Sequence, residues 1–235
     1  MNLAELLRTT AFCKNEAVYL EEIADVNRAV PEVKNALLVG STAGKFSITP
    51  KYKGRISKVT DLDFCFQRIP ESLKERLTKD YLTDWISVVY YSRGRDEVEV
   101  KSDYPVYRIN DYANVDIFDG SIGRIKLGVY VKGEHKSIVI GEKEITVNVA
   151  EPGFLIATYI NPASLTKQRG DRGNLIVDSL NRDSPEKLER AFLICKKTLE
   201  DSDFSRKELG AVKRQFSQVY RKRSPLYVEF VGDLF

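Results

Sequence analysis

The sequence predicts an α/β fold in which a region of strands and helices is followed by a helical region. Two observations lead to this prediction. Short β-forming runs recur between residues 36 and 149, whereas from residue 151 onward the apolar residues follow helical spacing. We therefore expect residues 1–150 to form the first domain and residues 151–235 a C-terminal helical region.

The N-terminal segment is predicted to be helical. Residues 3–8 and 16–29 carry apolar side chains at the spacing of amphipathic helices, and Pro31 ends the second of them. Residues 36–39 then form a short apolar strand. The small residues of Gly40-Ser41-Thr42 allow a turn in which backbone amides can approach a ligand closely.

The middle of the chain is predicted to consist mainly of strands. The basic segment 49–58 contains Pro50 and Gly54, so we expect an exposed loop or a twisted hairpin there. A strand over 59–66 and a helix over 72–84 follow. Further strands are expected at residues 85–92, 98–101, 106–110, 114–118, 126–131, 137–140 and 144–149, with a hairpin turn at 141–143.

The last third is predicted to be mainly helical. Its candidate helices cover residues 154–160, 173–180, 185–199 and 205–221. The apolar run 227–231 is expected to dock as a terminal segment or, alternatively, to expose a strand edge that pairs with a partner.

Composition excludes several classes of protein. The 235 residues, 43% hydrophobic and 30% charged, can bury a sizeable core. No window approaches the roughly eighteen apolar residues of a membrane span, and the first ten residues lack the pattern of a signal peptide. We therefore expect a cytoplasmic protein without a membrane partner. Cys13, Cys65 and Cys195 are too far apart for a zinc site or a disulfide framework, so we expect them to be reduced.

The net charge of +3 is small but unevenly distributed. Residues 1–150 contain 22 basic and 22 acidic residues, whereas residues 151–235 contain 15 and 12. The densest basic cluster consists of Lys213, Arg214 and residues 221–223. Such a cluster forms either a solvated helix face or a contact with a phosphate backbone, and both interpretations stay open.

The most informative pattern is an acidic strand. Because successive side chains of a strand point to opposite faces, Asp61, Asp63 and Cys65 lie on one side and the apolar residues between them on the other. Carboxylates held this close repel each other unless a cation lies between them. Magnesium, or manganese in its place, suits such a site because it prefers hard oxygen ligands and keeps positions for water and phosphates.

A third carboxylate is expected from a later strand. Asp116 alternates with Val115 and Ile117, so it can share the polar face of the acidic strand if the two strands are adjacent. Asp111 and Asp119 are alternatives. Several carboxylates around one position are typical of sites that bind the metals used in phosphoryl transfer.

Taken in order, these patterns resemble a known superfamily. A Gly-Ser pair after an apolar strand, an Asp-x-Asp strand and a later single Asp between apolar residues are similar to the DNA polymerase β-type nucleotidyltransferases. Within that superfamily the chain is most similar to the minimal group related to the AbiEii abortive-infection toxins. The stretches that carry the resemblance are 38–43, 60–64, 115–118 and 149–158, and it extends over roughly residues 36–180.

The resemblance implies a mixed sheet flanked by helices and a metal-dependent transfer reaction. A nucleoside monophosphate would pass from an NTP such as ATP to a hydroxyl of RNA, for example tRNA, of a protein or of a small molecule. A toxin role with an antitoxin partner is also implied. The implied site has metal ligands at Asp61, Asp63 and Asp116 and nucleotide contacts at Gly40, Ser41 and Thr42.

The chain departs from the family pattern in two places. The basic segment 45–58 is an insertion that could clamp the triphosphate. Tyr159 stands where relatives have a lysine, and Leu175 stands where a first aspartate is expected, which leaves Asp178. Lys167 or Arg169 could replace the missing base. The charged group of Lys167, Arg169, Asp171 and Arg172 forms either a substrate contact or a solvated loop.

These departures favour an alternative from another class of protein. The chain would then be a catalytically degenerate module that binds nucleotide or RNA within a complex. A different metal-dependent phosphotransferase or nuclease could also use the same carboxylates, but the Gly-Ser turn is better explained by triphosphate binding.

Overall fold

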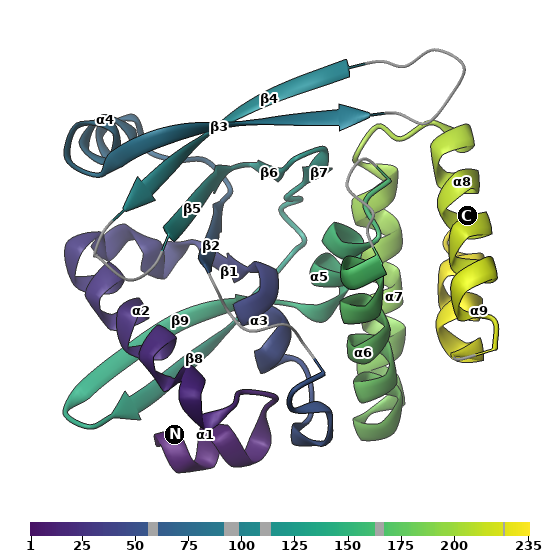
Figure 1. Ribbon diagram of the computed structural model, residues 1–235, viewed down its shortest axis with the longest axis horizontal. Helices are drawn as coiled ribbons and strands as arrows, with labels where there is room; N and C mark the ends of the chain where they lie inside the picture. The colour runs from purple at the N-terminus through teal and green to yellow at the C-terminus, as the bar shows by residue number, and fades with distance from the viewer. Residues whose placement is uncertain (56–60, 92–98, 109–113, 163–166, 223) are drawn as a thin grey trace.

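The computed structural model describes residues 1–55, 61–91, 99–108, 114–162, 167–222 and 224–235. Within these residues seven strands form one mixed sheet in the order β3-β4-β5-β2-β1-β9-β8 (Figure 1). β2 is parallel to β5 and β1 is parallel to β9, whereas the other neighbours are antiparallel. The strands are β1 Leu37–Val39, β2 Asp61–Phe66, β3 Leu82–Tyr91, β4 Glu99–Arg108, β5 Asn114–Asp119, β8 Gly133–Ile140 and β9 Lys143–Ala150. β6 Ser121–Ile122 and β7 Ile125–Lys126 form a separate pair.

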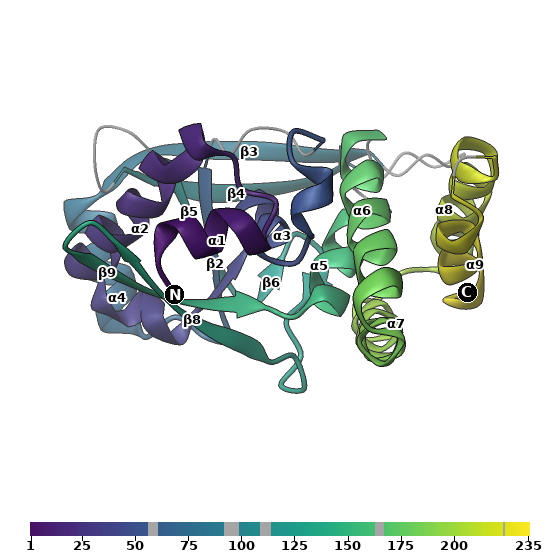
Figure 2. The ribbon, with the colours of Figure 1, turned by 90° about the horizontal axis from the view of Figure 1, so that it is seen from below.

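The helices lie on both sides of this sheet and beyond one end of it. Their bounds are α1 Leu3–Thr9, α2 Ala17–Ala29, α3 Gly40–Phe46, α4 Glu71–Asp80, α5 Pro152–Tyr159, α6 Lys167–Asp183, α7 Pro185–Glu200, α8 Arg206–Tyr220 and α9 Pro225–Asp233. In both ribbon views α8 and α9 lie outside α6 and α7, at the end of the molecule opposite to α4 (Figures 1 and 2). No strand of the described chain follows Ala150. Whether the helical region is a domain of its own stays a prediction.

The central strands bury their apolar side chains, as their alternating sequence predicts. Leu62 and Phe64 of β2 are almost completely buried, and so is Val115 of β5. Because side chains alternate along a strand, this burial fixes the intervening aspartates on the opposite face. The predicted hairpin turn is also confirmed, since β8 pairs with β9 across Gly141, whose φ of 61° is in the region that favours glycine.

A buried ion pair connects the N-terminal segment to α3. The Lys45 ammonium lies 2.6 and 2.7 Å from the two carboxylate oxygens of Glu16, and both side chains are 2% exposed or less. The Glu16 carboxylate also accepts a hydrogen bond from the Cys13 amide at 2.8 Å. Lys45 is therefore engaged in the core, and any contact of the 45–58 segment with a triphosphate would have to come from its other residues. Tyr52 of that segment is also buried, and residues 56–60 lie outside the described residues.

Four other predicted elements differ from the structure. The helix over 72–84 ends at Asp80, because β3 already begins at Leu82. The strands expected at 98–101 and 106–110 are one strand, β4, which runs through Pro105. Of the strand expected at 126–131, only Lys126 is in a strand. By contrast, the terminal run 227–231 is docked, as predicted: it is part of the helix α9, with Tyr227 and Val231 fully buried, and the alternative of an exposed strand edge is wrong.

α6 is longer than the periodicity predicts. It begins at Lys167 rather than near residue 173, so the expected loop residues Lys167 and Arg169 lie in its first turns. Gly170 and Gly173 stand at positions where a helix would normally carry larger side chains. Apolar spacing alone therefore does not reveal this part of α6. A Cβ at Gly170 would lie 2.7 Å from the Tyr220 hydroxyl, and one at Gly173 would lie 2.4 Å from the Tyr227 hydroxyl.

No helix among the described residues is both long enough and apolar enough to span a membrane.

Candidate functional site

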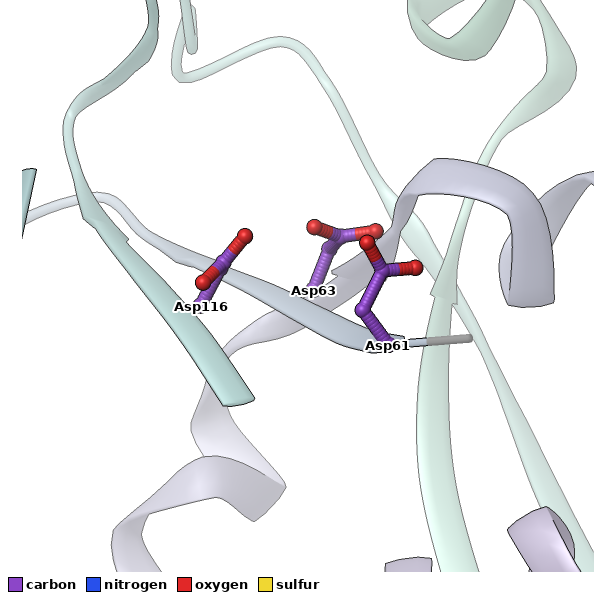
Figure 3. Close-up of side chains that lie close together, drawn as sticks. All are labelled: Asp61, Asp63 and Asp116. Carbon is purple, nitrogen blue, oxygen red and sulfur yellow. The ribbon is translucent and has the colours of Figure 1, made fainter. Parts of the chain in front are cut away.

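Three aspartates meet at the centre of the sheet. Asp61, Asp63 and Asp116 each offer a carboxylate oxygen, and these oxygens all lie within 4.8 Å of one another. Within the described part of the chain this is the one group of three or more acidic, histidine or cysteine side chains that could hold a metal ion. The three side chains rise from the same side of β2 and β5 (Figure 3). We call Asp61, Asp63 and Asp116 the carboxylate cluster.

Strand register explains why the cluster forms. β2 and β5 are parallel neighbours in which Asp63 is paired with Asp116, and Asp61 with Asn114. Paired residues of adjacent strands point to the same face, and Asp61 shares that face because it is two residues from Asp63. The sequence-based expectation that these carboxylates share one polar face is met. Asp119 lies at the exposed end of β5, where its carboxylate accepts a hydrogen bond from the Ile69 amide at 2.8 Å, and Asp111 lies outside the described residues.

The ionised form of the carboxylates is disfavoured within the cluster. Burial raises the pKa of Asp63 well above its usual range, and the neighbouring charges of Asp61 and Asp116 raise it further. Burial, followed by the charge of Asp61, raises the pKa of Asp116 to about 6. A divalent cation would relieve both the desolvation and the mutual repulsion of these carboxylates, so the cluster is electrostatically suited to bind one.

The Gly40-Ser41 turn lies directly against the carboxylate cluster. Gly40 has a φ of 64°, and a Cβ added to it would lie 1.7 Å from Oδ2 of Asp63. Only glycine fits this position, because both the backbone conformation and the contact exclude a side chain. Ser41 and Thr42 follow in α3 with their side chains almost completely buried, and the Thr42 hydroxyl donates to the Asp61 carbonyl oxygen at 3.3 Å. The turn and β2 therefore form one packed unit.

Tyr159 completes the packing of the turn. Its hydroxyl donates a 2.6 Å hydrogen bond to the Gly40 carbonyl oxygen, and a Cβ at Gly44 would lie 2.8 Å from the same hydroxyl. Burial raises the pKa of the Tyr159 phenol above its usual range, and the positive charge of Arg172 opposes that rise. The tyrosine therefore stays protonated as a donor. The sequence marks position 159 as a departure from the family pattern but does not reveal this contact.

Two arginines bring positive charge to the cluster from α6. The charges of Arg169 and Arg172 lower the pKa of Asp63, opposing its burial. The Arg172 guanidinium also lies 6.0 Å from the centroid of the Tyr159 ring, a cation–π distance. The sequence alone leaves Arg172 open between a substrate contact and a solvated loop. Its position three residues after Arg169, on one face of a helix, is the pattern that could have identified it.

Other sequence-predicted site residues have partners outside the cluster. The Lys167 ammonium forms an ion pair with the Asp171 carboxylate, one turn farther along α6, at 3.1 Å. Asp178 lies farther along α6, where Ser224 donates to its carboxylate at 3.5 Å, and burial raises its pKa. Leu175, at the position of the expected first aspartate, is buried in the core. α6 thus contributes arginines to the site rather than additional carboxylates.

No family model and no curated protein match this sequence. Two solved structures from Helicobacter pylori are similar at 14% identity and a TM-score of 0.35 each. One is described as a candidate nucleotidyltransferase, and the match covers 95% of this chain and 92% of that one. The other is JHP933, with 95% and 90% covered. Similarity at this level assigns no family, so the function proposed below depends on the carboxylate cluster and its surroundings.

Proposed function

We propose that the protein is a metal-dependent nucleotidyltransferase that moves a nucleoside monophosphate from an NTP to a hydroxyl acceptor. The observation that carries this proposal is the carboxylate cluster, whose three members lie on adjacent strands beside a glycine turn. The resemblance of the sequence to the DNA polymerase β-type superfamily, and its AbiEii-related group, supports the same activity.

The donor set fits magnesium or manganese. All three ligands are carboxylates, which supply the hard oxygens that these ions prefer, and three ligands leave coordination positions for water and phosphate oxygens. When bound, two such ions stabilise the attacking and the leaving oxygen of an in-line displacement. Asp61 and Asp63 would hold the metal, and Asp116 would complete the site.

The protein groups around the cluster have separate roles in this proposal. Arg169 and Arg172 supply positive charge where the triphosphate lies, because their charges act on Asp63. Gly40 and Ser41 let the chain approach the phosphates closely. The Asp116 carboxylate faces the acceptor and orients its hydroxyl, and its effect is mainly positioning. The acceptor oxygen bonds to the α-phosphorus as the bond to pyrophosphate breaks, and the hydroxyl proton passes transiently to the Asp116 carboxylate and then to water.

One observation favours a catalytically degenerate module that only binds nucleotide or RNA. The position where relatives have a lysine is taken by Tyr159, whose hydroxyl is engaged by the Gly40 carbonyl oxygen. Leu175 is buried and cannot supply a carboxylate. In this alternative, the cluster binds a metal and NTP but no transfer follows.

A transfer assay separates the two functions. The wild type is incubated with Mg²⁺, each α-³²P-labelled NTP and either total RNA or total cell protein as acceptor. We expect label on one acceptor class with the wild type, loss of label with Asp63→Asn, and wild-type labelling with Asp80→Asn, which removes an exposed carboxylate at the end of α4. NTP binding without labelling would favour the degenerate module. A folded protein that labels no acceptor and binds neither NTP nor RNA would refute both functions.

The proposed toxin role needs its own test. Expression of the wild type in a bacterial host should arrest growth, whereas Asp63→Asn should not. Growth that is unaffected by an enzyme shown to be active in the transfer assay would remove the toxin role and leave the transferase in place.

A further inference from the structure

The outer face of α8 is strongly basic. Arg206, Lys207, Arg214 and Arg221 are all exposed, and α8 has a single acidic residue, Glu208. The Glu208 carboxylate is engaged with Arg124 at 2.6 Å and with the amide of Ser205 at 2.8 Å. In the part of the chain that the structure describes, no carboxylate forms an ion pair with any of the four basic residues.

The four residues occupy one side of the helix. At 100° of rotation per residue they fall within an arc of about 100°, and they extend over about 22 Å of helix axis. We call Arg206, Lys207, Arg214 and Arg221 the basic face. Gly210 and Ser217 lie between them, so small side chains leave room for a ligand to approach the helix closely.

The rest of α8 holds this face outward. Val212, Phe216 and Tyr220 are buried on the opposite side. The rings of Phe216 and Tyr220 each lie 5.0 to 5.3 Å from the ring of Tyr227 in α9. Lys213, at the edge of the basic face, donates to the Gly232 carbonyl oxygen at 2.8 Å and so ties α8 to the end of α9. A packed apolar side fixes the direction in which the four charges point.

A second contact places the last turn of α8 beside the arginine-bearing end of α6. The Tyr220 hydroxyl donates to the Asp171 carboxylate at 2.8 Å and lies 3.3 Å from the Lys167 carbonyl oxygen. Arg169 is in the same first turns of α6, and its charge reaches Asp63. The end of α8 that precedes Arg221 therefore lies beside the start of α6, whose Arg169 acts on the carboxylate cluster.

We propose that the basic face of α8 binds the phosphate backbone of an RNA that serves as the acceptor. This inference rests on the proposed transferase function and names the class of its acceptor. A row of basic residues with no acidic partner is complementary to a polyanion, and it is too long for one small phosphate. RNA also ends in a ribose whose hydroxyls can accept the nucleotidyl group. The basic face would hold the backbone while the terminal ribose reaches the carboxylate cluster.

The test measures RNA binding separately from chemistry. A fluorescein-labelled RNA hairpin is titrated with full-length protein in EDTA, without NTP, between about 50 and 200 mM salt. The variant is the triple change Arg206→Gln, Arg214→Gln and Arg221→Gln. Its control removes three exposed lysines near α4, Lys34→Gln, Lys74→Gln and Lys79→Gln, at the opposite end of the molecule (Figure 1).

We expect the α8 variant to bind the hairpin at least about tenfold more weakly and to reduce the slope of log affinity against log salt by about two to three. The control should bind as the wild type does. Absence of hairpin binding by the wild type, or equal losses in the two variants, would overturn the proposal. An enzyme that transfers the nucleotidyl group to protein but binds no RNA would also overturn the proposal, while the transferase function would stand.

Failure of the transferase function gives a different result. In that case Mg²⁺-dependent transfer is absent although the wild type binds the hairpin and the α8 variant does not. Both triple variants should keep the thermal unfolding midpoint of the wild type, since all six substituted side chains are exposed.

Discussion

The Tyr159 hydroxyl donates a 2.6 Å hydrogen bond to the carbonyl oxygen of Gly40, although the two residues are 119 positions apart in the sequence. This bond connects α5, the first helix after the sheet, to the turn that contacts Asp63. Tyr159 therefore has a structural role in the candidate site.

Removing that hydroxyl should destabilise the protein. We expect Tyr159→Phe to lower the free energy of unfolding by about 1 to 3 kcal/mol, because the part-buried Gly40 carbonyl loses its donor. Urea unfolding measures the change. Tyr227→Phe is the matched control, since Tyr227 is fully buried and its hydroxyl has no hydrogen-bond partner within the described residues. That substitution should be neutral or stabilising, and equal losses in both variants would argue against a specific role for the Tyr159 bond.

Gly40→Ala should abolish metal binding and destabilise the protein. A methyl group there would lie 1.7 Å from Asp63 Oδ2, so the turn or the carboxylate must move. Gly141→Ala is a control for the backbone effect, because Gly141 has a φ of 61° and no neighbour within 4 Å of an added Cβ. The control should lose only about 1 to 2 kcal/mol and keep Mn²⁺ binding, measured by calorimetry. Wild-type Mn²⁺ affinity in Gly40→Ala would contradict the close contact between the turn and the cluster.

Much of this site could be predicted from sequence because it depends on local patterns. The alternation around Asp61, Asp63 and Asp116 defines which face each carboxylate occupies, and adjacency of two strands then brings them together. The contact of Tyr159 could not be predicted in this way, and the role of Arg172 could be given only as one of two alternatives. Both depend on how α5 and α6 pack against the turn. The periodicity of a helix predicts which side is buried, but not which residue of another element each side chain contacts.

The errors in the fold prediction also come from contacts between residues that are far apart in the sequence. The sequence predicts the segment 45–58 to be one insertion, but Lys45 pairs in the core with Glu16, 29 positions earlier, and the local sequence does not show this partner. The first turns of α6 contain two glycines, which weaken its helical pattern, yet contacts with Tyr220 and Tyr227 fill the space that larger side chains would need.

Metal affinity should depend on pH near pH 6. The pKa of Asp116 is raised to about 6, and that of Asp63 is raised well above its usual range, so protons compete with the cation for both carboxylates. The pKa of Asp116 is about 6 in the folded protein and about 4 in the unfolded chain, so the folded state binds its proton more tightly. The metal-free protein therefore loses stability as the pH increases from about 4 to about 6, and the loss persists at higher pH. Added Mn²⁺ should reverse this loss above pH 6.

Thermal unfolding at about pH 5 and about pH 7.5, with and without Mn²⁺, measures this effect. The Mn²⁺-induced increase in the unfolding midpoint should be larger at the higher pH for the wild type. Asp116→Asn should raise the metal-free midpoint at the higher pH and reduce the Mn²⁺ effect, because it removes one repelling charge and one ligand. A Mn²⁺ effect that is the same at both pH values would rule out proton competition at the cluster.

The buried pair between Lys45 and Glu16 should stabilise the fold only when both charges are present. Lys45→Met leaves the Glu16 carboxylate in the core without its cation, and we expect a loss of about 3 to 5 kcal/mol in the free energy of unfolding. Adding Glu16→Gln should recover part of that loss, because the uncompensated charge is removed while the amide oxygen can still accept from the Cys13 amide. Urea unfolding of the two single variants and the double variant gives the coupling energy between the residues. Additive losses would show that the two charges do not compensate each other in the folded protein.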